Sequence, residues 1–211
     1  MQHIKKQMVI LAEPNDKTKV FLRTETINNE ISMLIEQCKL GNQQAQMTLY
    51  NKYYRMAYNT AFRLVKNKQD AEDLMQEAFL TCFDQLESLH ETAKFGGWLK
   101  KTVINKSINY LNRNKNKWLT LHDKDAVETE SEPQDDKELE SIQVKLIYEE
   151  IKNLPEGYRI ILTLYLIEGY DHQEIAEILN IKSSTSRSQY TRARQKLKDN
   201  LLRKYERQFE K

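Results

Sequence analysis

The sequence predicts an all-helical protein built from two small domains. Three observations support this: long stretches with the apolar spacing of amphipathic helices, no sustained strand-like alternation, and only five Gly and three Pro among 211 residues. A highly charged segment with almost nothing to bury separates the helical stretches. We therefore expect a disordered extension over 1–29, a helical domain over 30–118, a flexible acidic linker over 119–138 and a second helical domain over 139–211.

Two helices are expected to open the first domain. Apolar residues from Ile31 to Cys38 follow helical spacing, and the pattern stops at Gly41. Asn42 can then cap a longer helix that reaches about Lys66.

Two further helices are expected to complete this domain. Asp70 is predicted to cap the third, which carries one continuous apolar stripe as far as Leu86. Cys82 lies in that stripe and Cys38 on the apolar face of the first helix, which favours two reduced core thiols. After the polar segment "ESLHETAK", the stretch "FGGWLKKTVINKSINYLNRNKNKW" predicts a helix with apolar residues inside and cations outside.

Residues 139–211 predict helices that end in a helix-turn-helix. The apolar stretch "RIILTLYLIEG" is expected to form a buried helix. Asp171 and Glu174 have the spacing of a capping box, with Asp in place of Ser or Thr, and Asn180 suits a left-handed turn position. Four residues of the last helix are spaced to face inward: Ser186, Tyr190, Ala193 and Leu197.

Charge is distributed unevenly along a chain whose net charge is only +2. Residues 94–118 hold seven cations and no acid, residues 119–142 carry −7, and residues 180–211 carry +7. Two basic blocks on separate domains indicate two surfaces that bind polyanions. The last helix, with outward Arg, Ser and Thr side chains, suits a DNA major groove, which is about 12 Å wide.

Other classes of protein fit less well. No apolar run is long enough to span a bilayer or to serve as a signal peptide, so we expect a cytoplasmic protein without membrane insertion. The sequence shows no phosphate-binding glycine loop and no nucleophile constellation, and its four histidines lack metal-ligand spacing: His3, His90, His122 and His172. We therefore expect neither an enzyme nor a metal or other cofactor, and a helical scaffold would leave the basic blocks unexplained.

Four stretches, in this order and spacing, closely resemble an extracytoplasmic-function sigma factor, a small two-domain subunit of bacterial RNA polymerase. They are "DAEDLMQEAFL", "FGGWLKKTVINKSINYL", "LPEGYRIILTLYLIEGYDHQEIAEIL" and "TSRSQYTRARQKL". The resemblance covers about residues 30–205 and implies a protein that recruits polymerase to promoters and helps to open them. A stand-alone helix-turn-helix regulator is the alternative, and it leaves the first domain without a role.

The resemblance also implies three sets of site residues. A core-polymerase set matches positions that contact the clamp helices of the largest subunit: Asp73, Gln76, Glu77 and Phe83. The family's specificity loop, which captures a flipped base, corresponds to about residues 87–95. A −10 set of candidates near the unwound strand lies at the end of this loop and beyond it: Lys94, Phe95, Trp98, Lys101, Asn105 and Lys106. A −35 set lies on the recognition helix: Arg187, Ser188, Thr191, Arg192 and Arg194.

The implied partners are core polymerase, promoter DNA and an anti-sigma factor that occludes both domains. Two residues depart from the family pattern. Ser186 stands where a core valine is usual, and Gln189 stands where a basic residue is usual. The first departure is expected to loosen helix packing, and the second to remove a phosphate contact or change the sequence preference.

Overall fold

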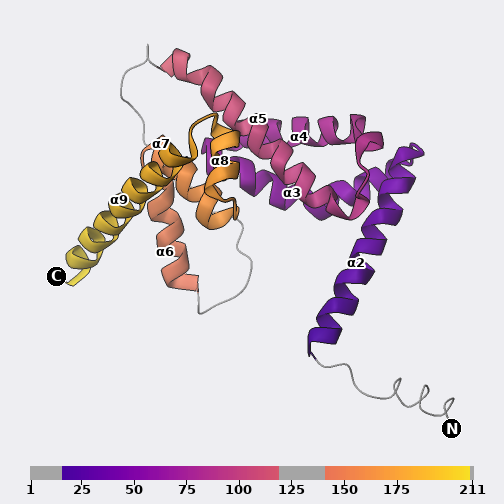
Figure 1. Cartoon of the computed structure of the whole chain (residues 1–211), viewed down its shortest axis with the longest axis horizontal. Coiled ribbons are helices and arrows are strands. Elements are labelled where there is room, and N and C mark those ends of the chain that lie inside the picture. Colours follow the sequence, from indigo (N-terminus) through magenta and orange to yellow (C-terminus); the bar gives the residue numbers. More distant parts are fainter. Residues whose placement is uncertain (1–15, 119–140, 210–211) are drawn as a thin grey trace, which may run out of the picture. The chain divides into compact units, whose positions relative to one another are not determined.

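The fold is described from a computed structural model that covers residues 16–118 and 141–209, and each element in these ranges is helical (Figure 1). The linker expected over 119–138 and the helix start expected at Leu139 lie outside the described residues. In chain order the elements are α2 (Asp16–Lys39), α3 (Gln43–Val65), α4 (Lys68–Asp84), η1 (Leu86–Ser88), η2 (Thr92–Lys94), α5 (Phe95–Trp118), α6 (Ser141–Lys152), α7 (Glu156–Leu162), η3 (Thr163–Ile167), α8 (His172–Leu179) and α9 (Ser183–Phe209).

The chain forms two compact units, which we describe separately. Among the described residues, unit 1 comprises residues 16–55 and 79–99, and unit 2 comprises residues 56–78, 100–118 and 141–209. The boundaries fall inside α3, α4 and α5, so each of these helices supplies residues to both units.

Unit 1 has an aromatic and aliphatic core. Phe95 is fully buried, and its ring lies 5.5 Å from that of Tyr53 and 6.5 Å from that of Phe83. Gly96 allows this approach, because a Cβ there would lie 2.8 Å from Cε1 of Tyr53. The Thr92 hydroxyl donates to Oγ of Ser32 (2.7 Å), which ties η2 to α2.

Unit 2 has two buried apolar clusters. The first joins the end of α3 and the middle of α5 to α7, η3 and α8: Leu64, Ile104, Ile108, Ile160, Ile161, Leu164 and Ile175. The second joins α6 and α7 to α9: Ile151, Leu154, Leu162, Ala193 and Leu197. The same apolar spacings that predicted the helices thus supply both clusters.

Several local predictions are confirmed. The Asn42 side chain accepts hydrogen bonds from the backbone N–H of Gln44 (2.9 Å) and Ala45 (3.1 Å), so it caps α3 as expected. Cys38 and Cys82 are buried thiols and neither forms a disulfide. Burial raises the pKa of the Cys38 thiol, which keeps it protonated.

Two predicted helix starts are wrong. Helix α2 begins at Asp16 rather than near Ile31, so residues 16–29 of the expected disordered extension are helical. The sequence holds no Gly or Pro between Pro14 and Gly41 to interrupt it. Asn67, not Asp70, caps α4: its side chain accepts from the Asp70 N–H (3.0 Å), and Asp70 lies in the first turn, where an acid also stabilises a helix.

The buried helix predicted from "RIILTLYLIEG" is only partly correct. Helix α7 ends at Leu162 and passes into η3, a π-helical turn in which the Glu168 N–H donates to the Thr163 carbonyl (2.9 Å). The wider turn rotates Tyr165 and Leu166 outward, where they are 36% and 48% exposed. Uniform hydrophobicity predicted burial, but it could not reveal the change of helical pitch.

Candidate DNA and polymerase interfaces

Helices α8 and α9 form the expected helix-turn-helix. The Asp171 carboxylate accepts from the N–H of Gln173 (2.7 Å) and Glu174 (2.9 Å), and the Glu174 carboxylate accepts from the Asp171 N–H (2.8 Å). This confirms the capping box, and the two backbone hydrogen bonds lower the pKa of Asp171. Asn180 has φ of 52°, so it occupies the predicted left-handed position of the turn.

The recognition helix is fixed by a polar contact that sequence reasoning missed. Ser186 is fully buried, and its Oγ forms a 3.0 Å hydrogen bond with Nδ1 of His172 at the start of α8. The His172 ring stacks on Tyr165 (4.7 Å between centroids) and meets Tyr190 edge-on (5.4 Å). The hydroxyl expected to loosen the helix therefore has a partner, and no periodicity or cap in the sequence pairs these two positions.

The −35 set lies on the outer side of α9. All five residues are exposed, while Ser186, Ala193 and Leu197 are buried and Tyr190 is half-buried, as predicted. The Ser188 and Thr191 hydroxyls bond to carbonyls of their own helix, at Thr185 and Arg187. The remaining donors of the set are guanidinium groups, which can bond guanine edges or phosphates.

The core-polymerase set divides into a polar and an apolar part. Asp73, Gln76 and Glu77 are exposed on α4, while Phe83 is half-buried and packs on Phe79. Leu80 is 63% exposed, one turn after Gln76. Sequence reasoning did not select Leu80, although its position outside the apolar stripe of α4 signals an unburied hydrophobic residue.

The −10 set is rearranged by the structure. Phe95 is fully buried, so it supports the fold of unit 1 and does not offer a ring for base stacking, contrary to our expectation. Trp98 is half-buried with its ring edge-on to Phe95 (6.2 Å). Lys101 and Asn105 are exposed one helical turn apart on α5.

The two lysines at the ends of the −10 set form ion pairs. Lys94 Nζ lies 2.7 Å from a Glu91 carboxylate oxygen, in a pair exposed to solvent. Lys106 Nζ lies 3.4 Å from a carboxylate oxygen of Glu77, so unit 2 brings one residue of the −10 set to one of the polymerase set. Both pairs are weak in water, so phosphates can compete for these lysines.

The described residues offer neither a metal centre nor a membrane span. Within them, no group of three or more His, Cys, Asp and Glu side chains could hold a metal ion. No helix in the same ranges is long and apolar enough to cross a bilayer.

Comparison with known proteins matches both helical stretches to one family. A model of sigma-70 region 2 matches residues 49–117, and a model of sigma-70 region 4 matches residues 145–197. The chain is 27% identical over 177 residues to the ECF RNA polymerase sigma-E factor of Haemophilus influenzae, covering 80% of this chain and 93% of that one. It is 28% identical over 183 residues to the ECF RNA polymerase sigma factor SigW of Bacillus subtilis, covering 81% and 96%.

The chain belongs to the ECF sigma factors. A solved structure of the sigma factor RpoE from Bartonella quintana, in complex with the anti-sigma factor NepR, has the same fold. Its TM-score is 0.51 at 19% identity, and the match covers 74% of this chain and 95% of that one. The protein is thus a sigma factor that acts in transcription initiation, and sigma factors bind RNA polymerase and promoter DNA.

Proposed function

We propose that this ECF sigma factor directs core polymerase to promoters through two DNA-binding surfaces. Residues 30–118 form sigma domain two and residues 139–211 form sigma domain four, joined by the linker over 119–138. The observation that carries the proposal is the arrangement of α9. The whole −35 set is exposed on this helix, and a buried hydrogen bond between Ser186 and His172 joins it to α8, which begins with a capping box. The outward arginines contact base edges or phosphates of duplex DNA in the major groove.

The exposed polar face of α4 is the docking surface for core polymerase. Asp73, Gln76 and Glu77 offer two carboxylates and an amide to basic partners on the clamp helices of the largest subunit. Leu80 supplies exposed apolar area on the same helix, and the half-buried Phe83 follows it by three residues. This combination of charge and apolar surface is typical of helix–helix interfaces.

The exposed face of α5 holds the unwound −10 strand. Lys101 and Asn105 contact the strand, and Lys106 and Lys94 exchange their carboxylate partners for phosphates. The half-buried Trp98 lies on the same helix as Lys101 and contacts a base with the exposed part of its ring. Phe95 is left out of this set because it lies in the core. The loop over 87–95, which contains η1 and η2, captures the flipped base.

The protein has no catalytic role of its own and needs no cofactor, since polymerase makes the RNA. It works in the cytoplasm, where bacterial polymerase acts. An anti-sigma factor controls it, as supported by the fold shared with RpoE, which was solved in complex with the anti-sigma factor NepR.

In vitro transcription from a fragmented genomic library tests the proposal. Purified core polymerase, from the source organism where obtainable, is assayed with and without the protein. We expect discrete new start sites that need the protein, and their upstream sequences give both promoter elements. Specific binding to duplex DNA by the protein alone, without new starts, would instead favour the stand-alone regulator.

A further inference from the structure

The Glu168 carboxylate is an almost fully buried charge in unit 2. Its side chain is 2% exposed, and it follows η3, well away from all three sets of site residues in the sequence. Taking a carboxylate out of water is costly unless several partners compensate its charge. The identity of those partners therefore indicates what the residue does.

Three side chains of the predicted domain two surround this carboxylate. Oε1 lies 3.2 Å from Nη1 of Arg63 and 3.4 Å from the donating Oγ1 of Thr60, both on α3. Oε2 lies 3.0 Å from Nζ of Lys100 on α5. Each oxygen is thus held by a cation from a distant part of the chain, Oε1 by Arg63 of α3 and Oε2 by Lys100 of α5.

Two backbone features, a π-helical turn and a glycine with positive φ, flank Glu168. The π-helical turn η3 places the Glu168 N–H against the Thr163 carbonyl, and Gly169 follows with φ of +81°. A positive φ suits Gly because it has no Cβ. Single π turns inside helices are frequent at functional sites, and this one ends at the buried acid.

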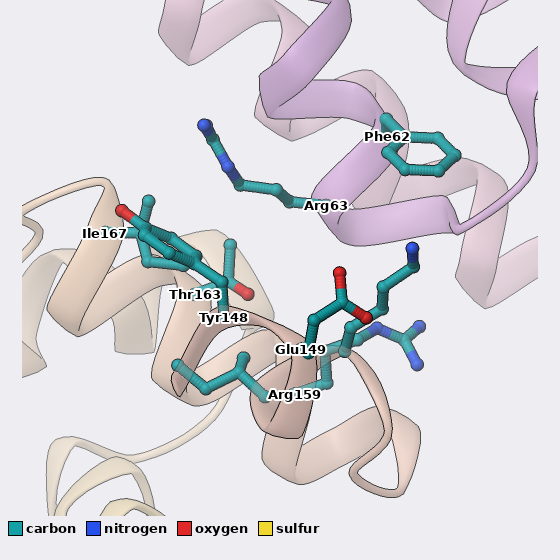
Figure 2. A pocket seen from close by; sticks show the side chains of 9 residues that line it. Phe62, Arg63, Tyr148, Glu149, Arg159, Thr163 and Ile167 are labelled. Carbon is teal, nitrogen blue, oxygen red and sulfur yellow. The ribbon is translucent and has the colours of Figure 1, made fainter. Parts of the chain in front are cut away.

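A second buried charge joins the same segments. Arg159 of α7 is 6% exposed, and its Nη2 donates to the carbonyl of Leu64 (3.0 Å) in the last turn of α3. A cation is favourable at this end of a helix. Figure 2 shows Arg63 extending from α3 on the side of Thr163 and Ile167, with Arg159 on α7 lining the same hollow.

Apolar packing also brings the helix-turn-helix, α8 and α9, close to α5, which carries most of the −10 set. Ile104 and Ile108 of α5 share a buried cluster with Ile175 of α8. Gln189 of α9 and Asn112 of α5 line one further hollow. An uncharged residue at 189, where the family usually has a cation, avoids repulsion from basic α5.

This packing conflicts with binding both promoter elements at once. Elements centred near −10 and −35 lie about 25 base pairs apart, or about 85 Å along straight DNA at 3.4 Å per pair. Helices α5 and α8 cannot share a buried core while their domains reach both elements. The contact must open before the sigma factor can engage a whole promoter.

We propose that Glu168 is an intramolecular latch that holds domain four against domain two through Thr60, Arg63 and Lys100. The inference rests on the proposed assignment of the two DNA-binding domains. When the two domains separate, Arg63 and Lys100 lose their carboxylate partner and the apolar cluster around Ile104, Ile108 and Ile175 becomes exposed. Polymerase and the whole promoter bind this open form. The latch thereby keeps the unassembled protein from engaging both promoter elements at once.

The Glu168→Gln variant tests the latch in the full chain. Gln keeps the shape but loses the charge, and we expect the ratio of open to closed protein to rise about tenfold, which corresponds to about 1.4 kcal/mol. Small-angle scattering should give a larger radius of gyration. Acetylation followed by mass spectrometry should show faster modification of Lys100 relative to its exposed neighbour Lys101, which serves as an internal reference.

Two further variants complete the test. Glu177→Gln removes the same charge from an exposed position of α8 and should match the wild type in both measurements. Arg63→Gln with Lys100→Gln removes the other half of the latch and should enlarge the protein as Glu168→Gln does. An unchanged radius of gyration in Glu168→Gln would overturn the proposal, even if Lys100 reacts faster, because only the local ion pair would then have been lost.

The same measurements separate the latch from the proposed function. Scattering and acetylation use the protein alone and need no promoter. With core polymerase limiting, Glu168→Gln should also give about threefold more transcript than the wild type at early times, by population shift. If the wild-type protein supports no new start sites, the proposed function is wrong. If the wild type does support them but the radius of gyration of Glu168→Gln is unchanged, only the proposed latch is wrong.

Discussion

Nδ1 of His172 and Oγ of Ser186 lie 3.0 Å apart and join the first residue of α8 to the buried side of α9. The hydroxyl is fully buried, and the imidazole is enclosed by Tyr165 and Tyr190. A buried hydroxyl needs a hydrogen-bond partner, and this pair satisfies it. The angle between the two helices of the DNA-binding motif therefore depends on a polar contact where the family usually has an apolar one.

Ser186→Ala is expected to destabilise the helix-turn-helix by about 1 kcal/mol, the typical contribution of one such hydrogen bond. His172→Phe keeps the aromatic contacts and removes the bond from the other side. Urea unfolding followed by circular dichroism of both variants and of the double variant gives the coupling energy. Strictly additive effects would show that the two residues do not stabilise each other.

Changing Asp73, Gln76 and Glu77 together to Ala should abolish co-purification with core polymerase while leaving the helical content unchanged. The three side chains are exposed on α4, so their loss removes interface contacts rather than packing. Glu36→Ala with Gln37→Ala, on exposed α2 positions, is the control and should bind normally. Undiminished binding by the triple variant would refute the assignment.

Arg192→Ala should weaken binding to a −35 duplex by about 1–3 kcal/mol, the range for a lost arginine contact to a base. Arg203→Ala removes another exposed arginine farther along α9 and should have a small effect. Gel shifts at fixed salt compare the two, because phosphate contacts vary with ionic strength. Equal affinity of Arg192→Ala and wild type would remove Arg192 from the −35 set.

Lys101→Ala with Lys106→Ala should reduce promoter opening but not core binding. The first lysine is exposed on α5, and the second is paired only loosely with Glu77. Permanganate footprinting of unpaired thymines at the −10 element measures opening directly. Lys39→Ala with Lys52→Ala removes two charges from α2 and α3 and should leave opening intact, whereas normal opening in the α5 variant would contradict the prediction.

The cap of α8 predicts a pH dependence of stability. Two backbone hydrogen bonds hold the pKa of Asp171 below its usual value of 3.8. A carboxylate with a lowered pKa in the folded state stabilises the fold above its unfolded pKa, and this contribution is lost as the pH falls from about 4 through the folded pKa. Asp171→Asn keeps an acceptor oxygen, so its unfolding midpoint should lack this part of the acid dependence in circular dichroism melts.

Local signals along the chain were sufficient for much of the fold. Apolar spacing located most helices, and the caps at Asn42 and Asp171 and the left-handed Asn180 followed from side-chain chemistry alone. The outward set on α9 also followed, because helical periodicity relates outward positions to inward ones. The start of α4 was misplaced, since Asn67 and Asp70 are both good candidates near a helix start.

Burial and long-range pairing were decided only by the tertiary structure. The sequence by itself determined the two basic helices, the helix-turn-helix and the resemblance to sigma factors. Each of these features depends on residues that lie within a few helical turns of one another. Packing decided that Phe95 is core, that Ser186 meets His172, and that Glu168 meets Arg63 and Lys100. Such contacts join residues far apart along the chain, and no local period or cap encodes which distant side chain will compensate a buried charge or fill a space between helices.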